Sequence, residues 1–402
     1  MLSYGPEVAG TTLEPIALVG TYGELELEYA ALRKGCLLLD LPHRAVLEVT
    51  GSERLEFLNR MLTQELKPGG KWLGPRACVN SFWLNRKGRI DADLRVLVLD
   101  GRVLLECDAF AADRTVSGLG AFIISEDATI RDLSSSMHRL SLHGPTASVL
   151  LDAVREDSGV PIESLVEHQN AEITLGGATV VVDRRDLAGV VGLDLFVPEA
   201  AARVVYELLL SRGFNHAHPH ESGASSTLAG RVRLRPGGWH ALNIARIEAG
   251  SPMYNVDFGP DALPAETGVL KDRVSFTKGC YLGQEVVARM HSRGHAKREI
   301  VTLRGVPARA STSESDADDP MHGIAQPVSG APVYLPGPHN APAGEPVGTV
   351  TSSTVAPMLG AAVVCFASIK HDALDRPDFL VAAEGGLIPM MRSQTLRTFP
   401  PA

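Results

Sequence analysis

The stretch FTKGCYLGQE, residues 276–285, carries most of what the sequence says about fold and chemistry. Two glycines stand on either side of Cys280, so the backbone there can take tight or positive-φ geometry. Residues 283–285 open a predicted helix, and Cys280 therefore precedes a helix N-terminus. The helix dipole and the nearby Lys278 both favour a thiolate over a thiol. A thiolate attacks electrophiles or ligates iron, so the stretch predicts a reactive or metal-ligating cysteine.

A plainer interpretation of Cys280 fits the same residues. A cysteine at a tight turn is often a small buried hydrophobe, and local physics does not separate the two interpretations. The five cysteines lie far apart without a CxxC pair, which is typical of an intracellular protein with reduced thiols: Cys36, Cys78, Cys107, Cys280 and Cys365. Because iron–sulfur clusters usually need four protein ligands, a cluster on Cys280 would require ligands from a second protein.

Composition narrows the class of protein. The length of 402 residues predicts two or three structural units, and 45% apolar residues predict a sizeable core. With 38 basic and 47 acidic residues the net charge is −9, which argues against wide contact with a nucleic-acid backbone. No apolar run approaches the ~18 residues of a membrane helix, and the N-terminus lacks a basic start followed by an apolar core. We therefore expect a cytoplasmic protein with no membrane or direct nucleic-acid partner.

Hydrophobic periodicity predicts an α+β body over roughly the first 300 residues, followed by a small β-rich unit. Ser52 is the expected N-cap of the second helix. The expected helices are 24–34, 52–62, 114–119, a helix after the turn at 144–145, 199–212 and 239–249. The helix 199–212 is expected to end at Gly213 and to point Val204, Val205, Leu208 and Leu209 inward. The expected strands are 45–50, 77–84, 90–99, 103–107, 128–132, 139–142, 179–183, 193–197, 347–352 and 361–369.

Residues 278–285, KGCYLGQE, resemble the KGCYxGQE signature of the YgfZ family, which is related to the T-protein (GcvT) of glycine cleavage. Every fixed position of the signature matches. The resemblance extends along most of the chain through the segments 58–65, 84–94, 142–145 and 246–250. It implies an α+β fold of three domains, a ring around a central cavity where tetrahydrofolate can sit, with a small C-terminal β-barrel.

The resemblance also implies domain limits. Residues 1–300 are expected to form the folate-binding region of two intertwined α+β domains, and residues 301–402 a barrel-like domain. A polar, acidic stretch near 308–332 is typical of a flexible insertion.

The resemblance further implies which side chains face folate, whose pterin ring presents amide-like donors and acceptors and whose glutamate tail favours basic groups. Arg246 and Glu248 match the RIEAG helix end of the family, although charged residues at a helix end are usually solvated. Tyr254 equally fits a core aromatic with its hydroxyl at the surface. The folate-binding residues expected on this basis are Asp93, Arg246, Glu248, Tyr254, Asp257, Tyr281 and Gln284. Cys280 and Lys278 are the expected reactive pair, with Cys280 also a candidate iron ligand shared with a partner.

Two acidic positions bear on one-carbon chemistry. Asp91 and Asp93 lie on one face of a predicted strand, where they could also be two solvated carboxylates. The T-protein has an adjacent Asp pair there that participates in one-carbon transfer, and Asp93 aligns with it. Val190 stands where the T-protein has a glutamate that helps to hold the pterin. An apolar side chain cannot replace that carboxylate, which argues against glycine cleavage itself.

An alternating histidine segment has the spacing of a candidate metal site. His216, His218 and His220 would face one way on an extended strand, with Glu221 adjacent. A surface insertion is the stronger interpretation, because no HExxH or CxxC motif supports a metal. The sequence also has no GxSxG elbow, no P-loop and no GxGxxG motif.

The YgfZ resemblance implies a folate-dependent accessory factor that assembles or repairs iron–sulfur clusters. Its clients would be iron–sulfur enzymes, including radical enzymes of tRNA modification, and its partners would be cluster carriers. The implied cofactors are tetrahydrofolate or a derivative and a transient shared iron–sulfur cluster. Two alternatives stay open: a folate-dependent aminomethyl or methyl transferase that uses Asp93, and a folate-binding scaffold without chemistry.

Overall fold

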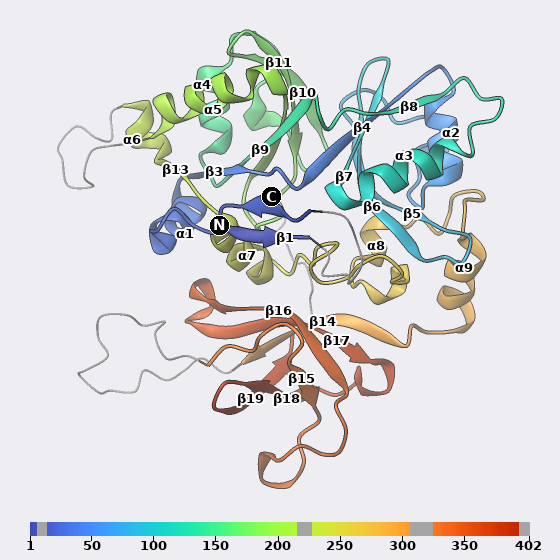
Figure 1. Ribbon diagram of the computed structural model, residues 1–402, viewed down its shortest axis with the longest axis vertical. Helices are drawn as coiled ribbons and strands as arrows, with labels where there is room; N and C mark the ends of the chain where they lie inside the picture. The colour runs from blue at the N-terminus through green and yellow to red at the C-terminus, as the bar shows by residue number, and fades with distance from the viewer. Residues whose placement is uncertain (6–13, 215–226, 306–324, 394–402) are drawn as a thin grey trace. The chain divides into compact units, whose positions relative to one another are not determined.

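The computed structural model describes residues 1–5, 14–214, 227–305 and 325–393, and these divide into two compact units (Figure 1). The first unit consists of Met1–Arg86, Asp91–Leu242 and Asp272–Leu282. The second consists of Lys87–Ile90, Asn243–Lys271 and Gly283–Ala402. The chain therefore crosses between the units several times, and the segment 276–285 is itself shared between them.

The first unit contains a six-stranded sheet in the order β10-β11-β12-β9-β3-β13. Its strands are β10 (Asn170–Leu175), β11 (Ala178–Arg184), β12 (Gly192–Pro198), β9 (Met137–His143), β3 (Cys36–Asp40) and β13 (Leu234–Pro236). All neighbours pair antiparallel except β13 and β3, which are parallel. Helices α4 (Ala147–Val154) and α5 (Glu199–Gly213) lie beside this sheet (Figure 1) and share one apolar core with it.

A five-stranded antiparallel sheet completes the framework of the first unit, in the order β5-β6-β7-β4-β8. Its strands are β5 (Cys78–Leu84), β6 (Ile90–Val98), β7 (Val103–Asp108), β4 (Arg44–Thr50) and β8 (Thr129–Asp132). Leu97 and Leu104 of this sheet pack in one cluster with Val181 and Phe196 of the six-stranded sheet. The two sheets therefore share buried apolar surface, and this contact fixes β6 against β11.

Several shorter elements lie outside these two sheets, some in the first unit and some in the second. They are β1 (Leu2–Tyr4), β2 (Ile16–Leu18), α1 (Leu25–Lys34), α2 (Arg54–Met61), α3 (Ala112–Gly120), α6 (Leu228–Val232), α7 (Trp239–Glu248), α8 (Leu270–Arg273) and α9 (Gln284–Arg293). None of the helices within the described ranges is long and apolar enough to cross a bilayer.

The second unit contains a closed six-stranded barrel in the order β14-β17-β16-β15-β18-β19, coloured orange to red in Figure 1. Its strands are β14 (Arg298–Gly305), β17 (Ala362–Lys370), β16 (Gly348–Ala356), β15 (Pro332–Tyr334), β18 (Asp378–Ala383) and β19 (Gly386–Arg392). Closure leaves no free sheet edge, and alternate residues such as Leu303 and Cys365 fill the interior. The predicted mixture of helices and strands with a small C-terminal barrel is confirmed.

Several local predictions are wrong for physical reasons. Ser52 is not the N-cap of α2, because Glu53 holds that position and the Ser52 hydroxyl donates to Asp127 at 2.6 Å. Val204 is 51% exposed and Leu208 is only partly buried, because α5 turns Val205 and Leu209 into the core, with Tyr206 and Leu210 packed at its edge. Strand β3 has a continuous apolar run without the alternation of a half-buried strand, and it was not predicted. Residues 308–324 of the flexible insertion expected at 308–332 lie outside the described residues.

Gly144 lies against the backbone of Gly35, and its replacement tests how closely these two segments pack. Its φ is +138°, and an added Cβ would lie 2.2 Å from the carbonyl oxygen of Gly35. We expect Gly144→Ala to lower the free energy of unfolding by roughly 2–4 kcal/mol, because backbone strain and overpacking add. Gly177→Ala is the matched control: its φ is +75° but an added Cβ meets nothing within 4 Å, so only the strain of about 1–2 kcal/mol remains. Urea unfolding of both variants measures the difference, and equal costs would contradict the clash.

Candidate functional site

The candidate site begins on one face of strand β6. Asp91, Asp93 and Arg95 are two residues apart along this strand, so their side chains point to the same face. Asp93 is only 11% exposed, and Arg95 is buried. Buried charges need partners of opposite charge or hydrogen-bonding groups. The residues that pair with Asp93 and Arg95 therefore define the candidate site.

Arg95 is the buried centre of the network. Its guanidinium donates to both carboxylate oxygens of Asp183 on β11, at 2.6 and 2.8 Å. Burial alone would lower the pKa of Arg95, but the Asp183 carboxylate outweighs it and raises the pKa. The remaining N–H groups donate to the carbonyl of Arg184 at 3.1 Å, to Asn80 Oδ1 at 3.3 Å and to His168 Nδ1 at 2.8 Å. All five donors of the guanidinium are therefore used.

A second ion pair continues the network toward solvent. Asn80 accepts from Arg95 through Oδ1, so its amide nitrogen is the atom that donates to Asp272 Oδ2, at 3.0 Å. Arg273 also donates to Asp272 Oδ2, and its other nitrogens reach Asp93 at 3.2 and 3.4 Å. The charges therefore alternate along the chain of contacts from Asp183 to Asp93.

The turn after helix α2 holds this second pair in place. The Thr63 hydroxyl donates to the carbonyl of Arg273 at 2.7 Å, and the Gln64 amide donates to the carbonyl of Asp272 at 3.1 Å. Lys278 fastens the same turn, because its ammonium donates to the carbonyls of residues Asn59, Leu62 and Gln64 at 2.6, 2.7 and 3.1 Å. The segment 272–278 is therefore attached to this turn through its backbone carbonyls and through the Lys278 side chain.

Lys278 is buried, and burial lowers the pKa of its ammonium to about 8 despite the opposing Glu65 carboxylate. Tyr281 is also buried, with its ring centre 5.2 Å from the Lys278 Nζ, and burial raises the pKa of its hydroxyl to about 12. All three ammonium hydrogens have carbonyl acceptors, so the lysine acts on the shape of the segment. Its expected influence on the thiol of Cys280 stays a prediction.

Cys280 differs from the other cysteines. All five lie within the described residues, and Cys280 alone is exposed. Burial raises the pKa of the other four thiols: Cys36, Cys78, Cys107 and Cys365. Gly283 takes the expected positive φ of 80° at the start of α9, whereas Gly279 does not need one. Gln284 is the first residue of that helix, as predicted.

The remaining predicted folate residues lie in the second unit. Arg246 and Asp257 form a fully buried ion pair at 2.6 Å, and both also bond to barrel strand β16 through Ser352 and Thr351. These contacts account for the pair through structure, because they join helix α7 to the barrel. The role of the two residues toward folate stays a prediction.

Glu248 and Tyr254 are also placed by local contacts. Glu248 accepts from the backbone nitrogen of Met358 at 3.0 Å. Tyr254 is buried with its ring edge-on to Phe258, at 5.9 Å between ring centres, which matches the core interpretation that the sequence left open. Asp93, Lys278, Tyr281 and Cys280 thus belong to the first unit, whereas Arg246, Glu248, Tyr254, Asp257 and Gln284 belong to the second.

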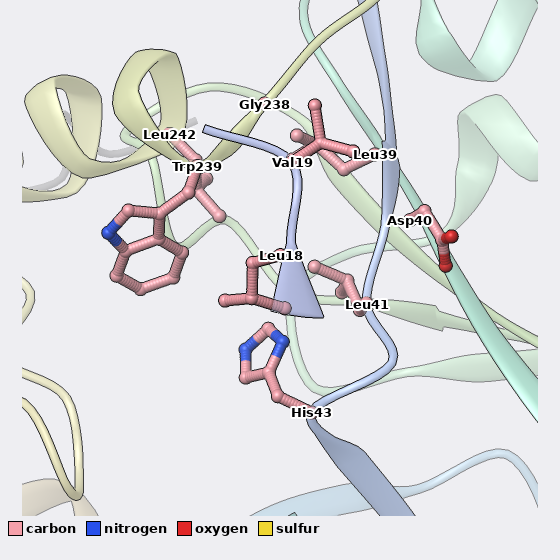
Figure 2. A pocket seen from close by; sticks show the side chains of 9 residues that line it. All are labelled: Leu18, Val19, Leu39, Asp40, Leu41, His43, Gly238, Trp239 and Leu242. Atoms are coloured by element: carbon pink, nitrogen blue, oxygen red, sulfur yellow. The ribbon is translucent and has the colours of Figure 1, made fainter. Parts of the chain in front are cut away.

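A small hollow in the first unit lies beside the His43 ring (Figure 2). Its cavity volume is about 10 Å³, about the space that one water needs. His43 is buried, its Nδ1 has no hydrogen-bond partner within the described part of the chain, and burial lowers its pKa to about 3. The Trp239 ring stands edge-on to it with centres 5.9 Å apart. The hollow is too small for a pterin, so it is not the candidate site.

Ser141, His143 and Asp194 share hydrogen bonds but do not form a hydrolase triad. The Ser141 hydroxyl donates to Asp194 at 2.7 Å and accepts from His143 Nε2 at 2.8 Å. His143 therefore cannot take the serine proton, and all three side chains are buried.

No group of three or more His, Cys, Asp or Glu residues that could hold a metal ion occurs in the described ranges. The segment with His216, His218 and His220 lies outside them. Cys280 supplies one thiolate at most, so these residues do not fit a complete iron–sulfur site.

Several residues of the site were not predicted: Asn80, Arg95, His168, Asp183, Asp272 and Arg273. Arg95 carried a usable signal, because it follows Asp93 at the two-residue spacing of a strand face. The other residues are far apart in sequence, and only the packing of β6 against β11 brings them together.

The fold has a counterpart among solved structures. The solved structure of the glycine cleavage system aminomethyltransferase T from Bartonella henselae is similar with a TM-score of 0.74. The similarity covers 95% of this chain and 92% of that one at 20% sequence identity, and it shows the fold.

The sequence comparisons show the family. Residues 21–278, well over half of the chain, match the model of the GCVT N-terminal domain, and the protein belongs to that family. The aminomethyltransferase of Bacillus licheniformis is 26% identical over 342 residues, covering 84% of this chain and 80% of that protein. The aminomethyltransferase of Moorella thermoacetica is 25% identical over 339 residues with the same coverage. The predicted kinship with the T-protein is confirmed.

Lys278→Met tests the clamp on the turn. Methionine keeps most of the apolar stem but leaves the carbonyls of Asn59, Leu62 and Gln64 without their shared donor. We expect the free energy of unfolding to fall by roughly 2–4 kcal/mol. Lys271→Met, at an exposed lysine, should change it by less than about 0.5 kcal/mol. Denaturant unfolding of the two variants is the measurement, and similar values for both would contradict the clamp.

Proposed function

We propose that the protein is a folate-dependent transferase that moves an aminomethyl or related one-carbon group, with tetrahydrofolate as substrate. The family and the curated relatives named aminomethyltransferase support this proposal. The single structural observation in its favour is Asp93 on strand β6. Its carboxylate is nearly buried, and Arg273 of helix α8 holds it in an ion pair. A carboxylate so held can accept a proton from a folate nitrogen or stabilise positive charge that develops on it.

The residues around Asp93 suit a pterin in chemical type. Asp272 and His168 are partly exposed, at 32% and 39% of their side chains, and they belong to the same chain of polar contacts as the Asp93 carboxylate. Val190 departs from the T-protein at the position of its pterin-binding glutamate. We therefore propose a one-carbon donor other than that of glycine cleavage. In this proposal, residues 1–300 bind folate and residues 301–402 form the barrel domain.

Asp93→Asn is the direct test of this function. Asparagine keeps the shape but removes the negative charge and the proton acceptor, so we expect kcat for methylene-tetrahydrofolate formation to fall by about 10²–10⁴. Tetrahydrofolate and an aminomethyl donor are the reactants, and thermal unfolding checks that the variant folds. The matched control is Asp91→Asn, on the same strand face but outside the Arg273 pair. An unchanged rate for Asp93→Asn would remove the carboxylate from the mechanism.

A second function is favoured by one observation, the exposure of Cys280. With the KGCYLGQE motif, it supports a YgfZ-type role: a folate-dependent factor that assembles or repairs iron–sulfur clusters with a partner. Cys280 would attack or ligate, cluster carriers would supply the remaining ligands, and radical tRNA-modifying enzymes would be among the clients. The cell compartment for this role would be the cytoplasm.

Cys280→Ser separates the two functions. Because the side chain is exposed, we expect the free energy of unfolding to stay within about 0.5 kcal/mol of wild type. Activity of client iron–sulfur enzymes in a depleted strain should be lost, while methylene-tetrahydrofolate formation should persist. Another cysteine such as Cys365 cannot serve as the control, because its thiol is buried. Wild type and Asp91→Asn are therefore the reference proteins for both activities. Full rescue of client activity by Cys280→Ser would end the accessory role.

A further inference from the structure

We propose that an exposed basic loop of the first unit binds the poly-γ-glutamyl tail of the folate substrate. This basic loop consists of residues 67–76, KPGGKWLGPR. The inference deepens the proposed function and rests on it, because it names the form of folate that the same site takes. That form is a tetrahydrofolate whose tail carries several glutamyl residues.

The charge of the basic loop is opposite to that of the whole protein. The chain carries a net charge of −9, yet no acidic residue occurs between Glu65 and Asp91. The loop itself supplies three positive charges, from Lys67, Lys71 and Arg76. A local excess of positive charge on an anionic protein attracts polyanionic ligands to that one place.

The three cations of the loop are exposed and lack an anionic partner. Within the described ranges, none of the three side chains forms an ion pair or donates a hydrogen bond. Lys67 has one defined contact, a cation–π interaction that places its Nζ 4.7 Å from the centre of the Trp72 ring. This contact restricts the lysine without neutralising its charge, so the ammonium can still meet an anion from solvent.

The base of the loop is fixed although its surface is open. The nitrogen of Leu73 donates to the carbonyl of Leu66 at 2.9 Å and thereby closes the loop. Leu66 is buried, and its nitrogen donates to Asn59 Oδ1 of helix α2 at 2.8 Å. Gly69 and Gly70, with φ of +60° and +80°, allow the chain to reverse at the tip. The lysines are therefore presented from a defined position, which lowers the entropy that binding costs.

The basic loop begins directly after the turn that holds the outer ion pair of the network. Gln64 of that turn donates to the carbonyl of Asp272 at 3.1 Å, and Lys278 donates to the carbonyl of Gln64, also at 3.1 Å. Lys67 follows Gln64 by three residues, so the two Cα atoms lie within about 11 Å of each other. The loop therefore borders the candidate site within the first unit.

A poly-γ-glutamyl tail matches this arrangement in chemistry. The pterin and the carboxylates of the tail lie at opposite ends of folate, so the tail needs cations that stand apart from the pterin site. Each added glutamyl residue brings one more carboxylate on a flexible chain. Lysines on an exposed loop suit such a ligand, because an ammonium binds a carboxylate as a point charge without the fixed geometry of a guanidinium.

The experiment compares two folates and three proteins. Tetrahydrofolate and its pentaglutamate are titrated into the full-length wild type, into Lys67→Gln/Lys71→Gln and into Lys34→Gln/Arg212→Gln. The last variant is the matched control, because it removes two exposed positive charges from helices α1 and α5. Wild type and control should bind the pentaglutamate about tenfold more tightly than the monoglutamate, and Lys67→Gln/Lys71→Gln should lose most of that preference. Added salt should reduce the preference.

The outcomes separate this inference from the proposed function. Equal affinity of wild type for both folates overturns the inference and leaves the proposed function standing. A preference that Lys67→Gln/Lys71→Gln keeps in full, that the control loses equally or that salt leaves unchanged also overturns it. If wild type binds neither folate, the proposed function fails and the role of the basic loop fails with it. Thermal unfolding checks that the variants fold, as expected for changes at exposed side chains.

Discussion

The bidentate ion pair between Arg95 and Asp183 is the interaction on which the site depends. It joins strand β6 of the five-stranded sheet to strand β11 of the six-stranded sheet, and both side chains are buried. Replacement of such a pair by apolar residues often costs little stability, whereas removal of one partner leaves a costly buried charge. Its value here is therefore positional. A guanidinium with five directed donors can orient an aspartate, an asparagine and a histidine at once, and an apolar contact could orient none of them.

The residues that precede Cys280 also help to build the charged network. The segment that carries the motif begins at Asp272 and Arg273, the outer ion pair of the network. Lys278 and Thr63 fix its course over the turn after α2. The motif can therefore contribute to the site in two ways, through an exposed thiol and through the placement of two charged side chains that precede it. A substitution at Lys278 would disturb both.

The sequence predicted the elements well where local rules decide them. Helices α1 and α9 and two strands of the barrel, β16 and β17, followed from periodicity and turn residues. The prediction of Ser52 as a cap was wrong because Asp127, distant in sequence, competes for its hydroxyl. Strand β3 was missed because a strand buried on both faces has no alternation to detect.

The site was predictable only in part, for a related reason. Asp93 could be chosen because it follows a strand pattern and aligns with a known motif. Arg95 shares the strand face of Asp93 and could have been chosen on the same grounds. His168 and Asp183 could not, since their proximity to β6 depends on how two sheets pack. Arg246 and Asp257 were selected by the family motif, and the buried ion pair that they form could not be predicted from it; their role toward folate stays a prediction.

The charge of the assembled network bears on the kind of reaction it favours. Asp183, Asp272 and Asp93 contribute three negative charges, Arg95 and Arg273 contribute two positive charges, and His168 is neutral in the tautomer that Arg95 imposes. The network therefore carries one excess negative charge, and the carboxylates of Asp272 and Asp93 lie at its outer end. Transfer of an aminomethyl group to a folate nitrogen develops positive charge on nitrogen and carbon. Fixed negative charge aimed at such a centre lowers its energy without any reorganisation at the moment of reaction. An anionic intermediate would be repelled by the same arrangement, so the electrostatics of the network support the proposed transfer of a cationic one-carbon unit.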